Sequence, residues 1–369
     1  MLSPDVVVIG GGIIGVACAH RFASHGLTTT VLESGPEPGA ATPAAAGMLT
    51  TFAESDPADP MFVFSVRARD LYAELIPALQ EETGLDIAYR TDGILQLALD
   101  EDDITRLREA VSMQRQSGFT VDWLSIDEVR KIAPGVGPDV LGAAMAAEDG
   151  GLDPLALHQA LLESARRRHG VEIVASRGDQ LLFDGERVTG VRTASGTVSA
   201  GAVILAAGCW SSQVRGLPRA LPVEPIRGQM VALDWPPDEP PATVYAGHGY
   251  VMERRGEAIG GSTMEHVGYD PSTTQDGLDD VLAKIRRIYP ALGNATVRRT
   301  WAGLRPGTPD MLPIIGRDPT VTNLWYATGH GRNGILLAGI TGEVLLQLFT
   351  GEEVEYDLTP VDPARLWPA

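Results

Sequence analysis

The chain has 369 residues, of which 44% are hydrophobic, and its formal net charge at pH 7 is -19. This length predicts one large domain or two, with enough apolar side chains for a sizeable core. The acidic balance excludes nucleic acids and anionic membrane surfaces as expected partners, because both select basic patches.

The cysteines and the N-terminal stretch favour a cytoplasmic location. Cys18 and Cys209 show no metal-ligand spacing and are too few for a disulfide framework, so we expect two buried thiols. The N-terminal apolar run follows no basic segment and is interrupted by glycines, unlike a signal peptide. No stretch approaches the roughly 20 apolar residues of a membrane-spanning helix. We therefore expect a cytoplasmic protein without a membrane segment.

The stretch VVVIGGGIIG at 6–15 predicts a strand that leads through glycines into a helix. Gly10 permits the tight turn, Gly12 lets the backbone approach a pyrophosphate, and Gly15 lets the helix pack closely on the strand. The phosphates would lie at the positive end of the helix. A second strand ends at Glu33, whose carboxylate can accept ribose hydroxyls and would repel a 2′-phosphate. The pattern predicts a dinucleotide-binding unit.

Helical and strand patterns alternate along the first half of the chain. In order, the predicted elements are a Gly/Pro/Ala-rich loop over 34–49, a helix over 61–83, strands over 86–99 around an Asp92-Gly93 turn, a helix over 101–117, and a short helix opened by a capping box at Ser125. We expect a kink or break at Pro77, because proline disrupts a helix interior.

The second half of the chain supplies further elements of the dinucleotide-binding unit, which two intervening segments interrupt. In order, the predicted elements are a helix capped by Asp153 with Pro154 at its start, a strand over 171–176, a hairpin turning at Asp184-Gly185, a strand over 196–208, several strands over 222–264, a helix over 276–289, a strand over 323–329, and a helix over 335–349. The Ala and Gly residues at 206–208 leave room for a cofactor beside the strand end.

Two further stretches carry candidate chemistry. The loop GHGRNG at 329–334 precedes a helix, and the N-terminus of that helix would favour negative charge on a neighbouring ring, such as a reduced flavin if the bound dinucleotide is FAD. An ordinary helix cap would explain Gly334 but not Arg332. Arg305 can hold a carboxylate with its planar fork, or it can extend to the surface or pair with Asp310.

A strand tyrosine offers a second donor to such a carboxylate. Tyr250 should face the same way as Met252, and its hydroxyl could reach the carboxylate, although a strand tyrosine is more often packed. His248 is a weaker candidate. We find no Ser-His-Asp triad, carboxylate pair or metal-ligand set, and expect no metal.

Five motifs together resemble the D-amino-acid oxidase-like family of FAD-dependent oxidoreductases, and within it the glycine oxidases. They are VVVIGGGIIG with Glu33 and Ser34, AAAGML at 44–49, YAGHGYVMER at 245–254, WAGLRPGTPD at 301–310 and GHGRNGILLA at 329–338. The resemblance spans nearly the whole chain. It implies an α/β fold with a discontinuous Rossmann-type FAD-binding domain (1–84, 146–218 and 302–369) and a second, mainly antiparallel β-sheet substrate-binding domain (85–145 and 219–301).

The resemblance also implies how each site residue acts. FAD, bound non-covalently, would contact Gly10, Gly12, Ile13, Ile14, Gly15, Glu33, Ser34, Ala41, Thr42, Ala46, Gly47, Met48, Asp179 near the adenine, Gly208, His330, Gly331, Arg332, Asn333, Gly334, Ile335 and Leu336. Arg305 would clamp the substrate carboxylate and Tyr250 would support it through its hydroxyl. Arg332 would lie near the substrate and the flavin, and Met48 would form a pocket wall.

The implied reaction is hydride transfer from Cα of a small amino acid to flavin N5, with a neutral amine and no general base. Molecular oxygen would reoxidise the flavin to give hydrogen peroxide, and the imine would hydrolyse to a 2-oxo acid and ammonia. In glycine-oxidising members the imine supplies the thiazole of thiamine.

Three hypotheses stay open. They are an oxidase of glycine, sarcosine and small D-amino acids, a related dehydrogenase that passes electrons to a quinone or carrier, and a structural flavin subunit of a larger assembly. The presence of both Arg305 and Tyr250 weighs against the third. We expect a homo-oligomer.

Overall fold

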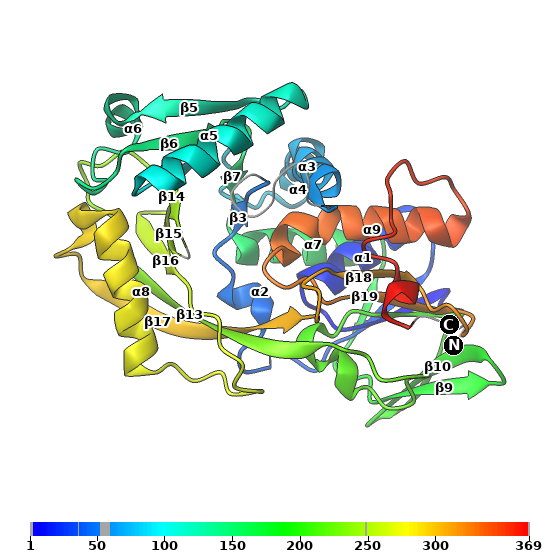
Figure 1. Cartoon of the computed structure of the whole chain (residues 1–369). Coiled ribbons are helices and arrows are strands. Elements are labelled where there is room, and N and C mark those ends of the chain that lie inside the picture. Colours follow the sequence, from blue (N-terminus) through cyan, green and yellow to red (C-terminus); the bar gives the residue numbers. More distant parts are fainter. Residues whose placement is uncertain (1–2, 36, 52–59, 248, 368–369) are drawn as a thin grey trace.

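The computed structural model describes residues 3–35, 37–51, 60–247 and 249–367, and two large sheets organise it (Figure 1). In the first sheet, every neighbouring pair runs parallel except β18 and β19. Its strands, in spatial order, are β18 (Ile314–Arg317), β19 (Leu324–Thr328), β12 (Ala202–Leu205), β1 (Val6–Ile9), β2 (Thr29–Leu32) and β8 (Glu172–Val174). Continuous apolar runs such as VVVI and AVIL suit a parallel sheet that is covered on both faces.

Successive side chains of β1 point to opposite layers, because the side-chain period of a strand is two residues. Val6 and Val8 pack against helices that cover one face of the sheet. Val7 and Ile9, on the other face, pack against a small antiparallel sheet. The helices are α1 (Ile13–Ser24), α3 (Phe62–Asp70), α4 (Tyr72–Thr83), α7 (Pro154–Arg167) and α9 (Gly334–Thr350), and the small sheet contains β9 (Gln180–Asp184), β10 (Arg187–Thr193) and β11 (Gly196–Ser199).

The second sheet has eight strands and is antiparallel except for the pair β14 and β4. In spatial order they are β17 (Val297–Gly307), β13 (Glu224–Asp234), β16 (Glu257–Gly261), β15 (Gly249–Arg254), β14 (Thr243–Ala246), β4 (Ile94–Ala98), β6 (Gly142–Ala146) and β5 (Val121–Ser125). The expected α/β fold with a Rossmann-type sheet and a second, mainly antiparallel sheet is confirmed. The expected domain boundary between residues 301 and 302 falls inside β17.

The two faces of the second sheet have different neighbours. Val231 and Val251 pack in a core that includes helix α8 (Gln275–Ile288). Met230, Tyr245 and Tyr250 belong to the opposite face, where they cluster with Ala46 of the loop that follows α2 (Ala41–Ala44). This α2 segment lies between the two halves of the molecule (Figure 1). Helices α5 (Glu101–Gln116) and α6 (Ile126–Ile132) cover the end formed by β4, β5 and β6.

One expected helix is divided at a different point. The pattern over 61–83 predicts a break at Pro77, but the chain breaks at Leu71, between α3 and α4, and Pro77 lies inside α4. Contacts from other segments hold both sides of this break. Arg69 forms ion pairs with Glu148 and Asp149, and the Tyr72 hydroxyl donates to the Ile335 carbonyl. Tertiary contacts therefore decide where the helix ends.

Two expected strand regions are also shorter than predicted. Within 86–99 only β4 is a strand. Arg90, on the other side of the expected Asp92-Gly93 turn, exchanges backbone hydrogen bonds with Gly151 and does not pair with β4. The single strand expected over 196–208 is two strands, β11 and β12, which belong to different sheets. The residues between them, Ala200 and Gly201, carry the chain from one sheet to the other.

The local signals of other elements are confirmed. Ser125 and Glu128 form the capping box, and the Asp153 carboxylate accepts from the backbone of the first turn of α7. Strands β9 and β10 form the expected hairpin at Asp184-Gly185. Both cysteines are buried free thiols. Among the described helices, none combines the length and apolar content needed to cross a membrane.

Candidate functional site

A cavity of about 560 Å³ lies between the two sheets. It brings together segments that are far apart in sequence, and nearly all of the expected site residues line it. These are Gly10, Gly12, Ile13, Ile14, Glu33, Ser34, Ala41, Thr42, Ala46, Gly47, Met48, Gly208, Tyr250, Arg305, His330, Gly331, Arg332, Asn333, Gly334, Ile335 and Leu336. Gly15 and Asp179 are not among the lining residues, although Gly178 is. His248 lies outside the described residues.

The glycines at the start of α1 bring strand, helix and cavity together. Gly10 has a φ of +107°, and a Cβ there would lie 2.5 Å from the carbonyl oxygen of Ala206. A Cβ on Gly15 would lie 1.9 Å from the carbonyl oxygen of Gly10, so helix and strand pack too closely for any side chain. The N-cap residue Gly12 supplies no side-chain cap. The positive end of α1 therefore faces the cavity, as an anion-binding terminus requires.

Glu33 is fixed beside these glycines at the carboxyl end of β2. One carboxylate oxygen accepts from Gly11 N at 2.6 Å and the other from Gly35 N at 2.8 Å. Each oxygen keeps acceptor capacity, because an ionised carboxylate has about four lone-pair sites. The side chain is half-buried and lines the cavity. Its position and charge fit a ribose diol.

The end of α2 and the loop that follows it are anchored by side chains of the second sheet. Trp301 Nε1 donates to the Ala44 carbonyl at 3.1 Å, and Arg254 Nη1 donates to the Ala46 carbonyl at 2.6 Å. Arg254 is half-buried, and this burial lowers the pKa of its guanidinium. The sequence motifs contain both anchoring residues but give no sign of this role, since each partner is distant in sequence.

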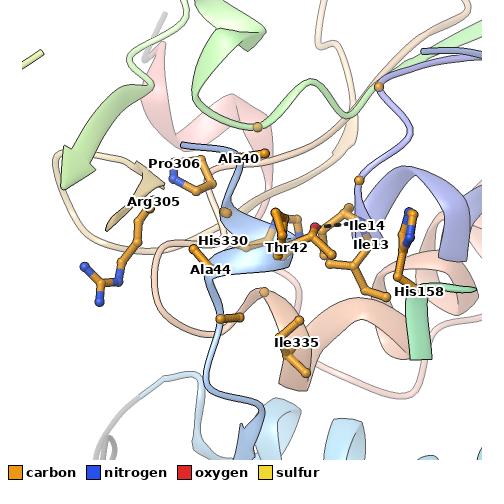
Figure 2. Close-up of a pocket in the computed structure, with 18 of the residues that line it drawn as sticks. Ile13, Ile14, Ala40, Thr42, Ala44, His158, Arg305, Pro306, His330 and Ile335 are labelled. Carbon is orange, nitrogen blue, oxygen red and sulfur yellow. Dashed lines mark hydrogen bonds between the residues drawn. The ribbon is translucent and has the colours of Figure 1, made fainter. Parts of the chain in front are cut away.

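His158 was missed by sequence reasoning and lies beside the first glycine turn (Figure 2). Its Nε2 lies 2.7 Å from the Gly11 carbonyl oxygen, so Nε2 carries the proton in this contact. Thr42 contributes on the opposite side, where its Oγ1 accepts from Ile13 N at 3.0 Å (Figure 2). Two side chains from separate helices thus hold the turn that leads into α1.

His330 marks the start of the second helix that faces the cavity. Its Nε2 lies 3.0 Å from Thr341 Oγ1, and that hydroxyl donates to the Leu337 carbonyl, so Nε2 is the donor. Burial lowers the pKa of His330 to about 3, which keeps the ring neutral at pH 7. Among the described residues its Nδ1 has no hydrogen-bond partner. The ring therefore offers an unused buried acceptor at the cavity.

Arg305 lies on β17 at the opposite end of the drawn cavity from His158 (Figure 2). Its Nη2 donates to Ser262 Oγ at 2.7 Å, and its Nη1 donates to the Thr263 carbonyl at 3.3 Å. The alternative pairing with Asp310 does not occur, because Asp310 forms an ion pair with Arg365. The guanidinium is half-buried and lines the cavity, as a carboxylate clamp would need.

Gly228 makes room for this guanidinium. It lies on β13, next to β17, and a Cβ there would be 2.0 Å from Arg305 Nη1. Gly228 was also missed by sequence reasoning, although a glycine inside the strand EPIRGQMVALD signals a close approach of another group. A residue without a side chain thus sets the position of Arg305.

Apolar and aromatic side chains form the walls near Arg305. Tyr250 is buried and its hydroxyl lies 3.3 Å from Met230 Sδ. Met48, Met230 and Tyr245 line the same cavity. Such walls exclude water and leave space for a small substrate.

The donor set fits FAD. The cavity joins a helix N-terminus with glycines, a fixed carboxylate, and a second helix start at Gly334. The first two features match a pyrophosphate and a ribose, and the second helix start would stabilise negative charge on a ring. Cys18 and Cys209 are not among the lining residues.

Comparisons with known proteins identify the family. A model of the FAD dependent oxidoreductase family (DAO) matches residues 5–348. A glycine oxidase of Bacillus subtilis is 35% identical over 364 residues, which cover 96% of this chain and 95% of that protein. The hydrogen cyanide synthase subunit HcnC of Pseudomonas aeruginosa is 31% identical and covers 99% of this chain and 96% of its own length.

Solved structures agree. The crystal structure of glycine oxidase from Geobacillus kaustophilus has a TM-score of 0.91 at 30% identity, and the match covers 97% of this chain and 98% of that one. Fold, cavity and sequence relationships therefore lead to one conclusion. The chain belongs to the DAO family of FAD-dependent oxidoreductases and is a glycine oxidase-like enzyme.

Proposed function

We propose that this enzyme oxidises glycine and other small amines, including sarcosine and small D-amino acids. For glycine, the overall reaction takes one O₂ and one water and yields glyoxylate, ammonia and hydrogen peroxide. The observation that carries the proposal is the position of Arg305, half-buried in the same cavity as the glycine turn of α1 but at its opposite end (Figure 2).

Bound FAD would supply the acceptor for the hydride that leaves Cα, and oxygen would take up the electrons. The residues that would hold FAD are Glu33 for the ribose, the glycine turn at 10–12 for the pyrophosphate, and the segment 330–336 around the flavin. Charge-assisted and backbone contacts of this kind fix the cofactor in one orientation.

Arg305 would bind the substrate carboxylate. Its hydrogen bonds to Ser262 and Thr263 fix the plane of the guanidinium, and a guanidinium has five N–H donors in a fork that matches a carboxylate. The Tyr250 hydroxyl would add a second donor. Holding Cα in near-attack geometry can contribute roughly 7–11 kcal/mol to catalysis, so positioning can replace a general base when the amine reacts in its neutral form.

Substrate size would follow from the walls of this end of the cavity. Met48, Met230 and Tyr245 are large, and all three line the cavity near the residues that would bind the carboxylate. Glycine needs no side-chain space, and sarcosine and D-alanine add one methyl group each. We therefore expect activity to fall steeply as the substrate side chain grows.

Anaerobic reduction tests the first part of the proposal. Glycine, sarcosine or D-alanine added to the FAD-loaded protein without oxygen should bleach the flavin absorption band. The reaction should require both a carboxylate and an amine, so ethylamine and acetate serve as matched controls. If none of the three amino acids bleaches the flavin, the proposed substrate class is wrong.

A second candidate follows from the relationship to HcnC, a subunit of a hydrogen cyanide synthase. In this alternative, the chain dehydrogenates the amine but passes electrons to a quinone or a carrier protein within a larger assembly. Peroxide release in air separates the two. An oxidase forms one peroxide per glyoxylate, whereas a dehydrogenase forms little peroxide and needs a redox dye for turnover.

We also propose, from the same family resemblance, that the imine of glycine serves in thiamine thiazole synthesis. A strain that lacks the enzyme should then require thiamine for growth and should be rescued by the added vitamin. Growth of the deleted strain without thiamine would contradict this role.

A further inference from the structure

A cluster of metal-ligating side chains lies away from the cavity. His20 of α1, Glu82 near the end of α4 and His169 just beyond α7 come from three separate segments. One ligand atom from each lies within 4.8 Å of the other two, and all three residues are half-buried. We propose that these three side chains form a zinc-class divalent cation site that links the three helices.

The donor set determines the class of ion. Two imidazoles and one carboxylate suit zinc and similar borderline transition metals, whereas magnesium and calcium prefer oxygen ligands alone. Bonds of about 2.0–2.1 Å place two ligands of a tetrahedral zinc about 3.3 Å apart. Starting from 4.8 Å, the ligand atoms therefore need to approach one another by at most about 1.5 Å. Rotations about side-chain bonds can supply a movement of this size.

The two histidine rings of the cluster are direct neighbours. The imidazoles of His20 and His169 meet edge to face, with centroids 5.1 Å apart and an interplanar angle of 88°. Metal ligands on one ion commonly have different ring planes, and this arrangement leaves each ring able to rotate toward the centre. The half-burial of all three residues gives a cation access from solvent and leaves the fourth position to water.

A buried serine connects two of the ligands. Ser164 Oγ donates to Glu82 Oε2 and lies 3.0 Å from His20 Nε2, so His20 is the donor in that contact. Metal binding through Nε2 would move this ring proton to Nδ1, with no net proton change on the ring. The serine would keep its hydrogen bond to Glu82 and hold the carboxylate in place, as groups next to metal ligands commonly do.

Both signs of charge are present near the cluster. The charge of Arg21 also acts on His20, and Arg21 forms an ion pair with Glu343 at 2.6 Å. The Glu82 carboxylate then supplies the negative charge that faces the two rings.

The site is separate from the cavity. His20 lies about 10 Å along α1 from Ile13, given a rise of about 1.5 Å per residue. Similarly, α7 carries His158 at the cavity and Ser164 at the cluster. Zinc would therefore join α1, α4 and the residue just beyond α7 at a place outside the cavity lining.

Zinc binding to the FAD-loaded protein, first freed of metal with a chelator, tests the proposal. Equilibrium dialysis should show one zinc per chain, and Tm should rise with the logarithm of free zinc. Cobalt should give a visible band at wavelengths beyond the flavin absorption. His169→Gln should weaken zinc binding at least tenfold, and Glu82→Gln should act in the same direction.

The exposed residue His25 provides a matched control, since it follows α1 but lies outside the cluster. His25→Gln should keep the wild-type zinc affinity and stoichiometry. Flavin content and metal-free Tm establish that each variant folds, and if His20→Gln fails to fold, His169→Gln decides the test. Wild-type affinity in His169→Gln, or no stoichiometric zinc in the wild type, would overturn the proposal.

Discussion

Replacing Gly228 by alanine should weaken substrate binding, although the substitution removes no group that touches the substrate. The new Cβ would lie 2.0 Å from Arg305 Nη1, and it would also lie 2.4 Å from both Cζ and Nη2. The contacts are with the far end of a flexible side chain, so the chain should fold and the guanidinium should move. The added methyl group should cost at most about 1–3 kcal/mol of stability.

The expected loss follows from the proposed role of Arg305. A hydrogen bond to a charged group contributes about 1.5–3 kcal/mol, so displacement of the guanidinium should lower kcat/KM for glycine roughly 10- to 160-fold. Binding of glycolate, which keeps the carboxylate, should weaken in parallel. FAD affinity should stay near the wild-type value.

The assay is steady-state oxidation of glycine with saturating FAD, read by peroxide or by a redox dye. Gly339→Ala on α9 is the matched control, because its new Cβ would meet only Leu75 Cδ2 at a comfortable 3.6 Å. If Gly228→Ala folds and keeps kcat/KM within twofold of the wild type, Arg305 does not act as the carboxylate clamp.

Three further predictions address the same site and its surroundings. Arg305→Met should lower kcat/KM for glycine by a similar roughly 10- to 160-fold, while FAD affinity stays near the wild-type value; a constant KM and kcat for glycine would reject the clamp. Arg254→Met should weaken FAD binding, measured by flavin fluorescence, because the Ala46 carbonyl loses its charged donor; unchanged affinity would mean that the loop needs no anchor. The folded-state pKa values of His20 and His330, about 4 and about 3, lie below the unfolded value, so only the unfolded chain takes up their protons as the pH falls. The unfolding free energy should therefore decrease by up to about 1.4 kcal/mol per pH unit for each residue between pH ~6 and ~4, and His20→Gln should reduce this slope in urea titrations; an identical slope would show that His20 is not buried in its neutral form.

The elements that sequence reasoning predicted correctly carry their signals locally. The turn from β1 to α1 is specified by Gly10 and Gly15: Gly10 has a positive φ that favours glycine, and a Cβ on Gly15 would meet the carbonyl oxygen of Gly10 in the same short segment. The capping box at Ser125 and the cap at Asp153 likewise involve residues two or three positions apart. A signal of this kind needs no knowledge of the remaining chain.

The elements that were wrong depend on partners far away in sequence. The helix break lies at Leu71 and not at Pro77, because Arg69 and Tyr72 are held by residues near 148 and 335. The strand expected over 196–208 is divided because its halves pair with β10 and β1. Propensity alone cannot indicate which sheet a strand joins.

The same distinction applies to the candidate site. Motif residues such as Glu33 and Arg305 could be found because a short pattern surrounds each of them. His158, Arg254 and Gly228 were missed because each acts on a segment that is at least about 75 residues away. Only Gly228 left a trace in the sequence, as a glycine inside a long strand.

The loop around α2 links cofactor binding to the substrate sheet. Thr42 accepts from Ile13 N at the start of α1, whereas the Ala44 and Ala46 carbonyls accept from Trp301 of β17 and Arg254 of β15. Strand β17 carries both Trp301, which holds the end of α2 beside the proposed FAD site, and Arg305, the proposed carboxylate clamp. A change in the register of β17 would therefore move both together, and this explains why the site can be built across two sheets yet hold a fixed geometry between cofactor and substrate.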